Sequence, residues 1–150
     1  MHAFMDELEA RFDEVRSREL EELIDELTDA ERASVTLSAR LAGADGLVNL
    51  ALRGGSVLVG QVLDSTRSWV LVREASCDSL VMLSALVGAW PLGRSVARES
   101  SVRGGVGVGH VLRELCARGV DVAIDSDCGD PRGIIDEVYA DHVGVAPSGA

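Results

Sequence analysis

Residues 48–72 read VNLALRGGSVLVGQVLDSTRSWVLV, and residues 120–145 read VDVAIDSDCGDPRGIIDEVYADHVGV. Both stretches run in the same order: an apolar run, a turn, a glycine-led apolar run, and a third apolar run after another turn. The matches are Val48–Leu52 with Val120–Ile124, Gly60–Asp64 with Gly133–Glu137, and Ser68–Val72 with Asp141–Val145. This internal repeat predicts that one small β unit is present twice.

In and after the first copy, apolar residues alternate with polar ones, and turns rich in Gly or Ser separate the apolar runs. Gly60 interrupts the second run, where it predicts a bend such as a barrel corner requires. The pattern predicts five short strands in a small, strongly curved barrel, at residues 47–52, 56–64, 68–74, 79–83 and 87–91.

The second copy follows a predicted helix over residues 108–117, which Gly119 ends. This copy stops after three strands, too few to close a barrel. Its open edges therefore need cover from the first copy, from the N-terminal helices or from another chain. Oligomerisation or close packing of two lobes is the expected consequence.

The N-terminal region reads as helix from Phe4 to Leu41, with an apolar stripe at three- and four-residue steps. The stripe slips by one residue near Arg16–Arg18, which predicts a kink or break, and Thr28–Glu31 resembles a second helix start. Two readings stay open for this helix: a coiled-coil or docking element, or packing on its own barrel. The candidate interface residues here are Leu8, Phe12, Val15, Leu20, Leu23 and Leu27.

The expected fold is therefore α+β and mainly β. An acidic amphipathic helix (1–30) precedes a five-stranded barrel (31–92), a Ser/Arg/Gly linker (93–106), and a helix with a partial barrel (107–150).

The net charge of −11 argues against a simple electrostatic nucleic-acid binder. Residues 1–32 hold 12 acidic and 4 basic side chains, whereas residues 33–118 hold 6 and 9, and residues 119–150 hold 7 and 1. A mildly basic middle between acidic ends suits intramolecular or head-to-tail association at least as well as an anionic ligand.

The three cysteines, Cys77, Cys116 and Cys128, have neither CxxC spacing nor a nearby histidine, so we expect reduced thiols and no zinc site. The N-terminus is acidic and amphipathic, and the apolar runs are strand-sized. We expect a soluble, cytoplasmic protein without a cofactor or a membrane segment.

With the helix, the Gly-containing turn, the bent glycine-led strand and Trp69-Val70-Leu71-Val72, the chain resembles the Sm-like or SH3-like small-barrel class. That class includes Sm and Hfq proteins and the C-terminal barrel of ribosome-maturation factors. The tandem form also resembles a family of unknown function from high-GC bacteria. The resemblance implies RNA association, but the Asp and Asn of the Sm base-reading loop fall on Thr66 and Val70 here, and on Tyr139 and Val143 in the second copy.

Three sets of residues could suggest a cofactor, catalytic or metal site, but each favours an ordinary structural role. The loop Gly105–Gly109 lacks the buried strand that a dinucleotide fingerprint requires. Neither His110 nor His142 belongs to a recognisable set of nucleophile, base and acid. The cluster Asp121, Asp125, Asp127 and Asp130 spans a hairpin turn, where Asp is favoured without a metal.

These observations predict a non-catalytic structural or regulatory protein that self-associates, with Trp90 and His142 as further candidate interface residues. An RNA-associated module is the alternative. Its candidate contacts are Arg53, Arg67, Trp69 and Arg73, because an aromatic ring can stack on bases while arginines bind the backbone.

Overall fold

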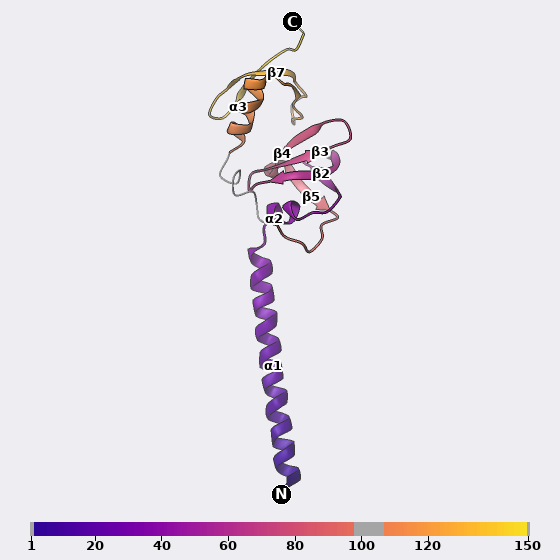
Figure 1. The fold of residues 1–150 in the computed structure, drawn as a ribbon, viewed down its shortest axis with the longest axis vertical. Helices are drawn as coiled ribbons and strands as arrows, with labels where there is room; N and C mark the ends of the chain where they lie inside the picture. Colours follow the sequence, from indigo (N-terminus) through magenta and orange to yellow (C-terminus); the bar gives the residue numbers. More distant parts are fainter. Residues whose placement is uncertain (1, 98–106, 150) are drawn as a thin grey trace. The chain divides into compact units, whose positions relative to one another are not determined.

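The structure is a computed structural model that describes residues 2–97 and 107–149. It is an α+β protein with a long N-terminal helix and two antiparallel sheets (Figure 1). The helices are α1 (His2–Ser34), α2 (Leu37–Ala42), the 3₁₀ turn η1 (Leu83–Ala85) and α3 (Val108–Arg118). The strands are β1 (Leu47–Leu52), β2 (Val57–Ser65), β3 (Trp69–Arg73), β4 (Asp78–Met82), β5 (Leu86–Trp90), β6 (Asp121–Ala123), β7 (Arg132–Val138) and β8 (Val143–Ala146).

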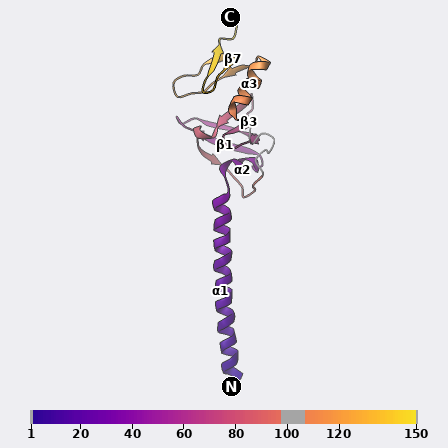
Figure 2. The same ribbon diagram turned by 90° about the vertical axis from the view of Figure 1, so that its left-hand side faces the viewer.

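Helix α1 is unbroken over 33 residues, so the predicted kink near Arg16–Arg18 is wrong (Figure 2). An apolar stripe with a strict seven-residue repeat drifts slowly around a straight helix. One extra residue in the repeat brings the stripe back without a break in the helix. The predicted helix start at Thr28 is wrong as well. Its hydroxyl donates to the Ile24 carbonyl at 2.8 Å, which is the bond of a threonine inside a helix.

The helix instead ends at Ser34, followed by the β-branched pair Val35 and Thr36. The Ser34 hydroxyl donates to the Glu31 carbonyl at 2.7 Å, and the Val35 amide to the Arg32 carbonyl at 3.2 Å. Both bonds satisfy carbonyls of the last turn. Here the chain divides into two compact units, the first ending at Thr36 and the second beginning at Leu37.

The larger sheet confirms the five predicted strands, each within about one residue of its expected bounds. Its order is β4-β3-β2-β1-β5 and every pair is antiparallel. The sheet is open, not the closed barrel that we expected, because β4 and β5 are its two edges and do not pair.

The short η1 turn nevertheless shows that this sheet is strongly curled. In a flat sheet, edges four strand spacings apart would lie about 19 Å from one another. Only Leu83–Ala85 link β4 to β5, and three 3₁₀ residues advance the chain by roughly 6 Å. The edges must therefore approach each other where η1 crosses between them.

The core of this unit lies between α2 and the concave face of the sheet. Its fully buried members come from α2 and from β1, β3 and β4: Leu41, Val48, Leu50, Val70, Val72 and Val81. Arg40 fixes the other side of α2, since its guanidinium donates to the carbonyls of Leu92 and Gly93, both at 3.2 Å. The start of the predicted linker thus packs on α2, whereas residues 98–106 of that linker lie outside the described residues.

The smaller sheet has the order β6-β7-β8, and α3 packs on β7 as α2 packs on β2. Gly119 ends α3 in the left-handed conformation, as predicted, at φ 62°. Both β6 and β8 are edge strands.

The β7–β8 hairpin has the same register as the β2–β3 hairpin. Each pairing from Gln61↔Arg73 to Ser65↔Val70 recurs 73 residues later, including a bulge at Leu63 and at Asp136. The first strands differ from the sequence match, however. Val48 lies opposite Gly60 but Val122, not Val120, lies opposite Gly133. A two-residue shift keeps every side chain on its face, so alternation alone could not detect it.

Candidate interaction surfaces

The apolar stripe of α1 is the most exposed hydrophobic surface in the first unit. No residue of α1 is buried. Leu8 is half-buried, and the other predicted interface residues are more than half exposed: Phe12, Val15, Leu20, Leu23 and Leu27. Phe4, Met5 and Ile24 add three large exposed side chains that the prediction omitted. The apolar stripe of α1 is therefore not buried by the rest of the described chain.

A second apolar surface covers the outer face of β1, β2 and β5. Cross-strand pairs place Val59 beside Asn49 and Asn49 beside Trp90, with Ala51 and Val57 in the next row. The exposed fractions are 64% for Leu47, 52% for Val57, 46% for Val59 and 48% for Trp90. We call Leu47, Ala51, Val57, Val59 and Trp90 the outer-face patch.

Sequence reasoning found only Trp90 in this patch, because it assigned the apolar residues of each strand to one inner face. The consecutive apolar residues Val57-Leu58-Val59 were the missed signal. Neighbouring strand residues point to opposite faces, so an uninterrupted apolar run indicates that both faces seek cover.

Trp69, the predicted stacking residue, is only 1% exposed and offers no ring face to a nucleic acid. A turn held by Thr66 fixes its position. The Thr66 hydroxyl accepts the Trp69 amide at 3.1 Å and donates to the Trp69 carbonyl at 3.1 Å. The Thr66 amide also donates to that carbonyl at 2.8 Å. The ring therefore belongs to the packed interior of its unit.

The three predicted nucleic-acid arginines are exposed but are not brought together. Arg53 lies before the start of the nine-residue strand β2 and Arg67 lies after its end, and such a strand can be up to roughly 30 Å long. Arg53 donates through Nε to the Ser84 carbonyl at 2.8 Å, which ties the β1–β2 turn to η1.

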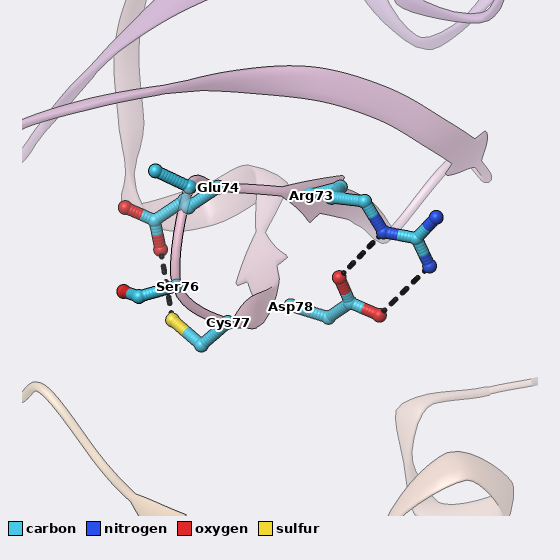
Figure 3. Close-up of a pocket in the computed structure, with 6 residues that line it drawn as sticks. Arg73, Glu74, Ser76, Cys77 and Asp78 are labelled. Atoms are coloured by element: carbon cyan, nitrogen blue, oxygen red, sulfur yellow. Dashed lines mark hydrogen bonds and ion pairs between the residues drawn. The ribbon is translucent and has the colours of Figure 1, made fainter.

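Arg73 lines a shallow pocket at the β3–β4 turn, formed by residues 73–78 (Figure 3). Its Nε and Nη2 lie 3.1 and 3.4 Å from the two carboxylate oxygens of Asp78, and this bidentate pair raises the pKa of Arg73 above its usual value. On the opposite rim, the Cys77 thiol lies 3.5 Å from Glu74 Oε2, and Ser79 donates to the same carboxylate. Two separate sets of contacts therefore hold this turn: Arg73 with Asp78, and Cys77 and Ser79 with Glu74.

The β7–β8 turn carries His142, which stacks on Tyr139 with ring centroids 4.4 Å apart. His142 Nδ1 lies 2.7 Å from Asp141 Oδ1, and Tyr139 donates to Glu137. That hydrogen bond raises the pKa of Tyr139, and desolvation and the nearby Asp136 carboxylate add to the rise. The His142 and Asp141 side chains are exposed, so this cluster lies on the surface.

Metal-binding side chains do not converge within residues 2–97 and 107–149, where no three His, Cys, Asp or Glu side chains form a site that could hold an ion. Asp121 begins β6, whereas Asp125, Asp127 and Asp130 lie at a turn in which the Ser126 hydroxyl donates to the Gly129 carbonyl at 2.6 Å. Part of the Gly105–Gly109 loop lies outside the described residues, and Gly107 caps α3. None of the described helices is long and apolar enough to cross a membrane.

Comparisons with protein-family models, with curated proteins and with solved structures find no match to this chain.

Proposed function

We propose that this protein is a non-catalytic structural or regulatory protein that self-associates through α1 and through Sm-like β units. The main observation that supports this proposal is that α1, a helix of 33 residues, has no buried residue. At about 25 cal/mol per Å² of buried apolar surface, leaving such a stripe in water forgoes several kcal/mol that association would recover.

The outer-face patch supports a contribution from the β unit. Trp90 and Val87, 48% and 63% exposed, lie on the edge strand β5, where backbone groups are available for pairing. The fold of this unit supports the Sm-like assignment: α2 precedes five curled antiparallel strands, and a short 3₁₀ turn connects the last two.

The shared register supports the proposal that the second lobe is a duplicate of the first. Gly60 and Gly133 make the same close approach, to the carbonyl of Arg73 and to that of Ala146, and the Thr66–Trp69 turn bond recurs between Tyr139 and His142. In the second lobe β6 and β8 lack the outer neighbours that β5 and β4 give to β1 and β3. Its bare edges add a further place for association in the proposed assembly.

The direct test is the mass of the full chain in solution, measured by light scattering at low and high salt. We expect a discrete oligomer that persists in high salt, because apolar burial is not screened by ions. Replacing Leu20, Leu23 and Leu27 by glutamine should release monomers and lower the helical circular dichroism signal, since an isolated α1 is only marginally stable.

The matched control replaces Glu21 and Asp25, which lie on the polar side of the same helix, by glutamine and asparagine. That variant should keep the parent mass. A monomeric parent chain would contradict the proposed function.

The alternative function is an RNA-associated module of the Sm or ribosome-maturation kind. The exposure of Arg53, Arg67 and Arg73 on one β unit favours it. It predicts binding to total RNA that weakens steeply with salt, and replacing Arg67 by alanine should reduce the slope of that salt dependence by about one. No binding at low salt would remove this alternative.

A further inference from the structure

The continuity of α1 gives its apolar residues one shared face. Met5 and Ala30 are 25 residues apart, and seven turns of about 3.6 residues also take roughly 25 residues. The residue inserted near Ser17 therefore returns the stripe to its starting direction. Eight residues form this stripe: Met5, Leu8, Phe12, Val15, Leu20, Leu23, Leu27 and Ala30.

The spacing of these eight residues is the same when read from either end of the helix. Steps of three, four and three residues lead from Met5 to Val15, and the same steps lead from Leu20 to Ala30. The five-residue step between them is centred on the Ser17–Arg18 peptide. A pattern with this reversal symmetry fits an isologous contact, in which two copies of one surface meet about a two-fold axis.

We propose that α1 pairs with α1 of a second copy in antiparallel orientation, about a two-fold axis between Ser17 and Arg18. This inference rests on the proposed self-association and specifies its geometry. The pairing sets Met5 against Ala30, Leu8 against Leu27, Phe12 against Leu23 and Val15 against Leu20, so that every apolar layer is filled from both helices.

Charges beside the stripe select the antiparallel direction. In antiparallel helices, residues that flank the apolar seam on the same side of each helix face one another. Arg11 then lies beside Glu26 of the second copy and Arg18 beside Glu19, and symmetry makes each pair twice. A parallel pair would instead place Arg11 beside Arg16 and Glu26 beside Glu31, which repel.

The ion pairs that Arg11 and Arg18 make within one helix do not prevent them from forming ion pairs with the second copy. Arg11 lies 3.4 Å from Glu7 and Arg18 lies 3.7 Å from Glu14, and all four side chains are more than 60% exposed. Exposed ion pairs contribute only about 0–1 kcal/mol each, so replacing them costs little.

The composition of the polar face disfavours a lipid surface as the occupant. Residues 1–32 carry 12 acidic side chains against 4 arginines, whereas interfacial helices on anionic membranes are rich in basic residues. A second copy supplies both the apolar stripe and the complementary arginines. An antiparallel pair would place the C-terminal ends of the two α1 helices about 50 Å apart, the length of 33 helical residues.

Disulfide trapping in the full chain tests the orientation, using a background with Cys77, Cys116 and Cys128 replaced by serine. Leu8→Cys and Leu27→Cys are made as separate proteins, mixed and allowed to exchange under mild oxidation. We expect the mixture to form a dimer crosslinked between position 8 of one copy and position 27 of the other, and neither protein alone to crosslink. Two copies of residue 8 would lie roughly 28 Å apart, far beyond the roughly 7 Å that a disulfide tolerates.

Charge reversal supplies the matched second measurement. Arg11→Glu/Arg18→Glu and Glu19→Arg/Glu26→Arg should each weaken self-association by about tenfold or more, and an equimolar mixture should recover it as a heterodimer.

Each other outcome overturns the inference. Crosslinking of Leu8→Cys alone would show a parallel pair. An oligomer that persists with neither crosslink would place association elsewhere, such as the outer-face patch, and would leave the proposed function standing. A monomer in the unmodified chain would overturn the inference and the proposed function together.

Discussion

Replacing Gly60 with alanine is expected to destabilise the five-stranded unit by about 1–3 kcal/mol. A Cβ at this position would lie 2.5 Å from the Arg73 carbonyl oxygen and 2.5 Å from Val72 Cγ1. Because Gln61 and Arg73 pair in the β2–β3 ladder, the carbonyl cannot yield unless the strands move apart. The close pairing of β2 with β3 therefore depends on the absence of a side chain at Gly60, and urea unfolding measures the loss of stability.

Gly88→Ala is the matched control, since it adds the same methyl group to a strand of the same sheet. Its Cβ would meet Trp90 at 3.7 Å and Ala51 at 3.8 Å, which are ordinary contacts. We expect its unfolding midpoint to stay close to that of the parent. Equal stability of Gly60→Ala and Gly88→Ala would contradict the close approach.

The strands could be located from the sequence, whereas the closure of the sheet could not. Val48–Leu52 and Ser68–Val72 are short apolar runs between turn residues, and such runs define strands locally. Closure depends on whether β4 meets β5, which involves contacts between residues far apart in the sequence. Five predicted strands led us to expect a closed barrel, whereas the sheet curls and remains open.

The helical errors have a different origin. A phase slip in an apolar stripe predicts a kink only when the whole stripe packs against one hydrophobic core. Helix α1 has no such core within its unit, so backbone hydrogen bonding alone decides its length, and it continues through Ser17. The same phase slip makes the spacing of the stripe symmetric, and the proposed antiparallel pairing of α1 is based on that symmetry.

The candidate site could be predicted only in part. The α1 stripe follows from periodicity, and its exposure confirms that those side chains are accessible. The role of Trp69 could not be predicted, because strand alternation does not show which face of a curled strand is covered. Thr66, whose hydroxyl holds the turn before Trp69, gave no signal either, since serine and threonine are common in turns.

Replacing Trp69 with alanine is expected to cost about 3–5 kcal/mol of unfolding free energy, because it empties a large and fully buried site. Trp69 is 1% exposed, whereas Trp90 is 48% exposed on the edge strand β5. The chain has only these two tryptophans, so Trp90→Ala is a natural control, for which we expect a loss of no more than about 1 kcal/mol. Urea unfolding followed by circular dichroism compares the two variants.

Fluorescence separates the structural role of Trp69 from a nucleic-acid role without removing the ring from the core. In Trp90→Phe the remaining Trp69 should emit at short wavelength and resist quenching by acrylamide, whereas in Trp69→Phe the remaining Trp90 should be quenched readily. Ready quenching of Trp69 in the folded chain would contradict its burial and restore it as a surface that bases can stack on. If Trp69 is protected, a loss of RNA binding in Trp69→Ala reports unfolding, and Arg67 becomes the residue whose substitution tests RNA contact.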